Sequence, residues 1–82
     1  MLDASQLRAA RALLGWSQDK LAEQSGVSKP TIARLELRDG EIGGYAATRD
    51  KLIAALEAAG VVFQGDGEVV QGGPGVRLRK EA

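Results

Sequence analysis

Residues 17–36, SQDKLAEQSGVSKPTIARLE, decide the fold of this chain. They predict a short helix that Ser17 caps and Gly26 stops, because a serine side chain satisfies free N–H groups at a helix start and glycine accepts the left-handed conformation at a helix end. Ser28 can cap a second helix. Pro30 comes early in this helix, where its missing N–H costs nothing, and residues 31–37 follow. Two capped helices joined by a glycine-containing turn are typical of a helix-turn-helix.

The apolar residues of this segment have the spacing that the motif requires. Ala22 is small at the point where two helices cross closely, and Val27 fills the junction between them. Ile32 and Leu35 fall on one face of the second helix and anchor it to a core. The opposite face of that helix is therefore expected to point outward.

The residues on either side predict two more helices, one over 5–14 that stops at Gly15 and one that begins at Thr48 and stops at Gly60. Asp3 or Ser5 can cap the first of them. Apolar residues recur at helical spacing in both, namely Leu7, Ala10, Leu13 and Leu14 in the first and Leu52, Ala55, Leu56 and Ala59 in the last.

Beyond Gly60 the pattern changes to β-branched and alternating runs over 61–63, 69–70 and 76–79, separated by glycine-rich turns. The fold class is mainly α, with a four-helix domain over 1–60 and a β-hairpin or three-strand meander over 61–82. One four-helix unit has little surface to cover these strands, and a lone hairpin is marginally stable, so we expect the tail to dimerise. The expected contact residues are Val61, Phe63, Val76 and Leu78.

Composition excludes most enzymes. The chain has 82 residues, no Cys and no His, so the thiol nucleophile, the commonest general base and the usual metal ligands are missing, and we expect no enzyme, metal or cofactor. The start of the chain lacks a secretory signal and no apolar run reaches ~18 residues, which favours a cytoplasmic protein without a membrane span. Basic and acidic residues balance at 11 each, so a nucleic-acid surface would have to be local.

The segment resembles the DNA-binding domain of the lambda-repressor-like family, also called the Cro/CI or Xre class, over residues 5 to 59. The resemblance rests on Leu14 to Gln18, Leu21-Ala22, Gly26-Val27-Ser28, Thr31-Ile32 and Leu35-Glu36. It implies that the third helix lies in the major groove and that Gln18 contacts phosphate. The DNA-facing positions it implies are Ser28, Lys29, Pro30, Thr31 and Arg34, with Arg38 just beyond the helix.

The chemistry of these side chains suits that role. Lys29 and Arg34 are long donors that can reach guanine O6 and N7, whereas Pro30 can offer only apolar contact, for instance to a thymine methyl. Ser28 and Thr31 can bond phosphate or base edges, with helix capping as the first role of Ser28. An ordinary surface position for Gln18 and a core position for Trp16 are the plainer readings of those two residues.

The resemblance also implies an ion pair between Arg11 and Glu36 that joins the first helix to the third. Three basic residues, Lys29, Arg34 and Arg38, stand against Glu36 across residues 28–38. The acids Asp39 and Glu41 in the loop that follows depart from the family pattern and should weaken contact with the DNA backbone.

These features favour a bacterial, sequence-specific transcriptional regulator that binds a partly palindromic operator as a homodimer. An antitoxin, which would bind DNA and a toxin partner, is the alternative. A protein-interaction module that binds no DNA is a third class, which zero net charge and the acidic loop favour. No small-molecule effector is indicated.

Overall fold

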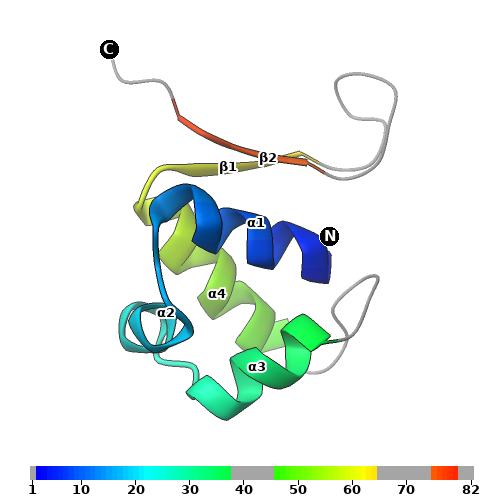
Figure 1. Cartoon of the computed structure of the whole chain (residues 1–82), viewed down its shortest axis with the longest axis vertical. Coiled ribbons are helices and arrows are strands. Elements are labelled where there is room, and N and C mark those ends of the chain that lie inside the picture. Colours follow the sequence, from blue (N-terminus) through cyan, green and yellow to red (C-terminus); the bar gives the residue numbers. More distant parts are fainter. Residues whose placement is uncertain (1, 38–45, 65–74, 80–82) are drawn as a thin grey trace.

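A computed structural model describes residues 2–37, 46–64 and 75–79. Four helices precede an antiparallel hairpin (Figure 1), which confirms the predicted mainly helical class. The elements are α1 (Ala4–Leu14), α2 (Gln18–Ser25), α3 (Lys29–Leu37), α4 (Ala46–Ala58), β1 (Val61–Gln64) and β2 (Gly75–Leu78). The expected strand at 69–70 lies outside the described residues.

The helix boundaries follow from their capping residues. Asp3 caps α1 in a capping box, since its side chain accepts from the N–H of Ser5 and its own N–H donates to Gln6 Oε1 at 2.8 Å. Gly15 and Gly26 end α1 and α2 at φ values of 69° and 76°, the left-handed conformation that glycine adopts without penalty. The predicted stops of both helices are confirmed.

α3 begins where its predicted cap, Ser28, places it, whereas α4 begins earlier than the pattern predicts. α3 begins at Lys29, so Pro30 occupies its first turn, where a helix needs no N–H donor. α4 begins at Ala46, two residues before Thr48, because Ala46 and Ala47 have the highest helix propensity of any residue and extend the helix toward its N-terminus.

The core lies between the four helices and the hairpin. Leu13 was expected inward but is 44% exposed, because it lies off the stripe that Leu7, Ala10 and Leu14 form along α1. Ala59 was also expected inward and is exposed, at the turn that follows the last residue of α4. The buried apolar residues are Leu2, Ala4, Leu7, Ala10, Leu21, Val27, Ile32, Leu52, Leu56 and Val61.

The hairpin packs on the helices of its own chain, with β2 against α1 and β1 against α4. The expectation that the helices leave these strands uncovered is wrong for Val61, which is 3% exposed and belongs to the core. Phe63 and Val76 pair across the strands and pack on the same core, whereas Leu78, opposite Val61, is 44% exposed. The core is larger than four helices alone would make, and Val61 has no surface left for a partner.

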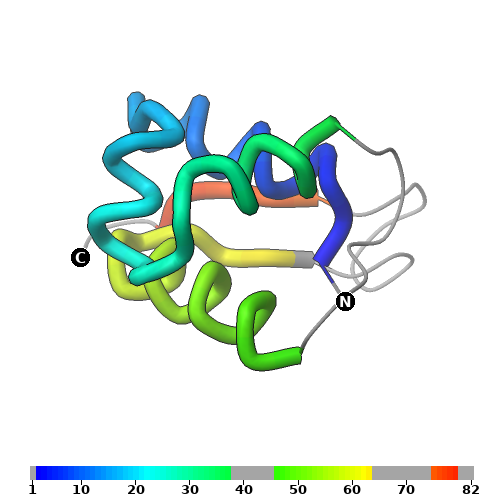
Figure 2. Tube along the Cα trace, turned by 90° about the horizontal axis from the view of Figure 1, so that it is seen from below, coloured from blue at the N-terminus to red at the C-terminus, as the bar shows by residue number. Residues whose placement is uncertain are grey.

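The hairpin and α3 lie on opposite sides of the helical body. Figure 1 shows the strands above α1 and α4, with α3 below them. Seen from below, α3 crosses in front of α1 while the strands lie behind (Figure 2). The outer surface of α3 is thus remote from the tail.

A buried glutamine fastens the tail to α1, and its loss should destabilise the fold. Gln6 Nε2 donates to the carbonyl of Gly75 at 2.9 Å. We expect Gln6→Ala to lower the free energy of unfolding by ~1–3 kcal/mol, because buried polar partners are left without their hydrogen bonds. Urea unfolding measures this loss. Gln24→Ala is the matched control, since within the described residues that exposed amide bonds only the side chain of Glu23, and an equal loss in both variants would contradict the assignment.

Candidate nucleic-acid interface

The carboxylate of Glu36 is the point at which three helices meet. It lies in the last turns of α3 and is 6% exposed. Arg11 of α1 binds it through two parallel hydrogen bonds, Nε to Oε2 and Nη2 to Oε1, both at 2.8 Å. Gln18, at the start of α2, donates from Nε2 to Oε1 at 3.0 Å. The Arg11–Glu36 contact that the resemblance implies is present in the structure.

Two further contacts strengthen this junction. Arg11 Nη1 donates to the carbonyl of Trp16 at 2.9 Å, which fixes the connection between α1 and α2. Trp16 itself is half-buried and packs against the core. Arg8 donates to the backbone carbonyl of Glu36, near the end of α3, where helix carbonyls lack partners of their own. We call Arg11, Gln18 and Glu36 the Glu36 network.

The electrostatics of the Glu36 network favour its charged form. Burial raises the pKa of Glu36, but hydrogen bonds from Arg11 and Gln18 and the positive charges of Arg11 and Arg8 outweigh it, so the pKa lies below its ordinary value of 4.5. The hydrogen bonds to Glu36 raise the pKa of Arg11 in turn. A buried carboxylate and a bidentate arginine therefore hold α3 against α1.

Gln18 is not a residue that faces solvent alone. Its side chain is half-buried, and Nε2 is turned toward Glu36. The resemblance implies a phosphate contact for Gln18, and the hydrogen bond to Glu36 is a contact that no sequence pattern indicated. The N-terminus of α2 and the rest of the amide remain the groups available to a phosphate.

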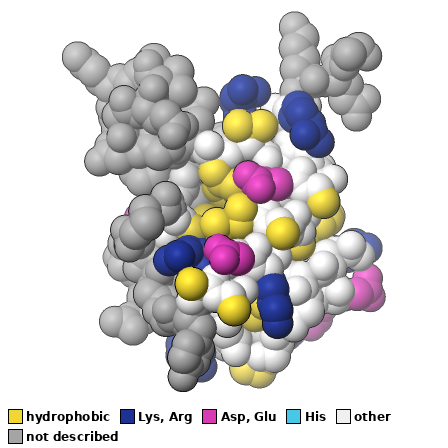
Figure 3. Space-filling view, turned by 180° about the vertical axis from the view of Figure 1, so that it is seen from behind, with side chains coloured by type: hydrophobic (Ala, Val, Ile, Leu, Met, Phe, Trp, Pro, Cys, Tyr) yellow, Lys and Arg dark blue, Asp and Glu magenta, His cyan; other side chains and the backbone are white. Residues whose placement is uncertain are grey.

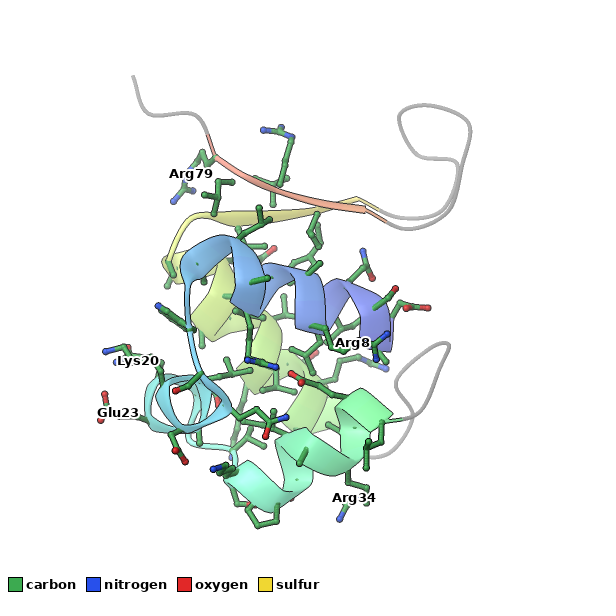
Figure 4. The ribbon with its side chains drawn as sticks, viewed as in Figure 1. Arg8, Lys20, Glu23, Arg34 and Arg79 are labelled. Atoms are coloured by element: carbon green, nitrogen blue, oxygen red, sulfur yellow. The ribbon has the colours of Figure 1, made fainter. Side chains whose placement is uncertain are left out.

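The outer face of α3 carries the other predicted contact residues. Ser28, Lys29, Pro30 and Arg34 are exposed and Thr31 is half-buried. Arg34 projects from α3 away from the body of the molecule (Figure 4). The Ser28 hydroxyl donates to Thr31 Oγ1 at 2.9 Å and accepts from the Thr31 N–H at 3.4 Å, so it caps α3 as expected.

Lys29 has a partner that sequence reasoning missed. Its ammonium lies 3.3 Å from Asp19 Oδ1 and 3.4 Å from Oδ2, across the turn between α2 and α3. Asp19 stands in the first turn of α2, where an acid is favoured by the helix dipole. That general preference was its only signal in the sequence, because the folded turn is what brings the two residues together.

The positive charge of this face is concentrated on few side chains. Arg34 forms no ion pair with another residue in the described ranges, whereas Lys29 is paired with Asp19. Arg38 and the acids Asp39 and Glu41 lie outside the described residues. On the back of the molecule, acidic and basic side chains of the described residues lie together (Figure 3).

Comparison with known families identifies the chain. A family model described as helix-turn-helix matches residues 7–61, which is most of the chain. The chain belongs to this family, which is of the Cro/CI or Xre type. It is a DNA-binding helix-turn-helix regulator, with α2 and α3 as the motif. A comparison with curated proteins gave no match.

The part of the chain that the structure describes contains neither a membrane-spanning helix nor a cluster of metal ligands. None of the helices there has the length and apolar character needed to cross a bilayer. Within the same ranges no group of acidic side chains is placed to hold a metal ion.

Acid should weaken the fold through Glu36. Because its pKa is lower in the folded chain than the ordinary 4.5, the network adds stability above that pH and loses it as the pH falls further. We expect the free energy of unfolding to drop below pH 4.5, and Glu36→Gln to flatten that drop. The flattening should be partial, because hydrogen bonds from Ser5 lower the pKa of Asp3 and act in the same direction.

Urea unfolding at a series of pH values measures the effect. Glu23→Gln is the matched control, because it removes the same charge from an exposed position on α2. Equal flattening by both variants would show that overall charge, and not the Glu36 network, sets the acid response.

Proposed function

We propose that the protein is a bacterial, cytoplasmic transcriptional regulator that binds a partly palindromic operator as a homodimer, with α3 in the major groove. The observation that carries this proposal is the division of α3 into two faces. Glu36 and Ile32 fix one face to the body of the molecule, and Arg34 projects from the other. A helix held in this way presents its outer side chains as a rigid set to base edges.

Each outer residue has a role in this scheme. Arg34 is the base reader, since a guanidinium can bond guanine O6 and N7 together. Lys29 is the second base reader, and Pro30 supplies apolar contact. Ser28 and Thr31 contact the backbone or base edges near the start of α3. Gln18 contacts phosphate, and Arg38 is a further DNA-binding residue.

Loss of Arg34 should change both affinity and base choice. A duplex selected from a random pool by the intact protein is the probe. We expect Arg34→Ala to weaken binding to that duplex by ~1–3 kcal/mol and to relax the preference at one base pair, because one bidentate contact is lost. Repeating the selection with the variant reports the preference.

Lys20→Ala is the matched control for loss of one positive charge. Lys20 is exposed on α2, pairs with Glu23 and points away from α3 (Figure 4). It should leave base preference unchanged. An Arg34→Ala variant that selects the same sites as the intact protein would contradict a reading role, and an intact protein that binds no duplex at low salt would contradict DNA binding.

Among the described residues β2 pairs only with β1, and its other edge is the surface we propose for dimerisation. The N–H of Arg79 donates to the carbonyl of Gly60 at 2.6 Å, which makes these two a hydrogen-bonded position of the ladder. Such positions alternate along an antiparallel pair, so the backbone groups of Arg77 face β1 while those of Val76 and Leu78 face outward. An edge of this kind can accept the same strand of a second copy.

This mode of pairing suits an operator with two half-sites. Antiparallel neighbours in one sheet are related by a two-fold axis perpendicular to it, so both copies would carry their helices on the same side. Because α3 lies on the side of the body away from the hairpin, both recognition helices would face one duplex. Half-sites about one DNA turn apart, ~34 Å, are expected.

A proline at position 78 tests the edge without cutting the hairpin. The Leu78 N–H points away from β1, so Leu78→Pro removes a donor that only a partner strand would use. We expect the intact chain to sediment as a dimer at micromolar concentration and Leu78→Pro as a monomer, with operator affinity about a hundredfold lower as the second half-site is lost. Leu78→Ala keeps the N–H and is the control. An intact chain that stays monomeric would contradict the dimer, and a dimeric Leu78→Pro would contradict this edge.

A further inference from the structure

The ion pair between Lys29 and Asp19 spans the two helices of the motif at its outer surface. Both carboxylate oxygens of Asp19 lie within 3.4 Å of the Lys29 ammonium. The Lys29 side chain is 52% exposed and that of Asp19 is 73% exposed. The pair is therefore open to an approaching duplex and is not part of the core.

The two cations on this face differ in what they can give to DNA. Arg34 has no acidic partner among the described residues, so it can move to any phosphate or base acceptor. Lys29 must first leave Asp19, and the carboxylate that it leaves then stands beside the negatively charged backbone. An exposed pair of this kind is weak, about 0–1 kcal/mol, so it can be broken whenever a better acceptor is present.

We propose that Asp19 is a positioning residue that sets the specificity of Lys29, an inference that rests on the proposed binding of DNA by α3. On a mixed-sequence duplex Lys29 would gain one phosphate contact. Two effects offset that gain, namely the loss of the Lys29–Asp19 ion pair and the repulsion between the exposed Asp19 carboxylate and the DNA backbone. On a site that offers a base acceptor within reach, Lys29 leaves Asp19 for a directed hydrogen bond. Asp19 thus lowers binding to arbitrary DNA more than binding to the preferred site.

Two observations separate this role from a purely structural one. Lys20 and Glu23 form a similar exposed pair at 3.5 Å, but both belong to α2 and point away from α3. The pair of Lys29 instead joins the start of α2 to the start of α3, the two helix ends that the proposed function brings nearest to the backbone. Within the described ranges Asp19 forms no ion pair with a residue other than Lys29.

The test compares two duplexes of equal length, one selected from a random pool by the intact protein and one of mixed sequence. Asp19→Asn keeps the size of the side chain and removes its charge. We expect it to bind the mixed duplex about threefold more tightly, with a salt dependence steeper by about one phosphate contact. Its affinity for the selected duplex should change less, so the ratio of the two affinities falls.

Three further variants fix the cause. Glu23→Gln removes a charge from the control pair and should leave the ratio unchanged. Asp19→Glu should restore the ratio, because a carboxylate is again within reach of Lys29. In a Lys29→Met background Asp19→Asn should no longer change the ratio or the salt dependence, since Asp19 acts through Lys29.

The outcomes that overturn the proposal are distinct from failure of DNA binding itself. A ratio that Asp19→Asn leaves unchanged, or lowers by the same factor in the Lys29→Met background, excludes action through Lys29. A loss confined to the selected duplex would mean that Asp19 reads a base directly. If the intact protein binds neither duplex at low salt, the proposed function fails and this inference fails with it.

Discussion

The carboxylate of Glu36 is buried near the end of α3, and three helices depend on how it is satisfied. An unpaired charge at this depth would lower the stability of the fold. Arg11 and Gln18 both lie at hydrogen-bonding distance from the carboxylate and satisfy it. Arg11 also holds the carbonyl of Trp16, which fixes the connection that leads into α2. The direction of the outer face of α3 is therefore set by contacts on its inner face.

The two sides of the molecule differ in what they contribute to the fold. The hairpin covers α1 and α4 and adds Val61 to the core, so the small domain gains buried area on the side away from α3. The hairpin does not cover the outer face of α3, where Lys29, Pro30 and Arg34 are exposed. A surface of that kind can carry a few charged side chains without loss of core.

Local signals in the sequence predicted most of the fold. Capping residues and glycines act over a few positions, so Ser17, Gly15 and Gly26 sufficed to place the ends of α1 and α2. Contacts between residues far apart in the sequence were harder to predict. The Asp19–Lys29 pair, the Gln18–Glu36 bond and the packing of Val61 against the core beside α4 depend on tertiary placement, and no periodicity in the sequence reports it. Arg11 and Glu36 were anticipated through the resemblance alone.

The most direct test of the Glu36 network is the free energy of unfolding of Arg11→Met, Glu36→Gln and the double variant. Arg11→Met leaves a buried carboxylate without its arginine and should cost ~3–5 kcal/mol. Glu36→Gln leaves a half-buried guanidinium that can still reach water, so it should cost less. We expect the double variant to be more stable than Arg11→Met alone, because it no longer buries the unpaired carboxylate of Glu36. Additive losses, with the double variant the least stable of the three, would contradict it.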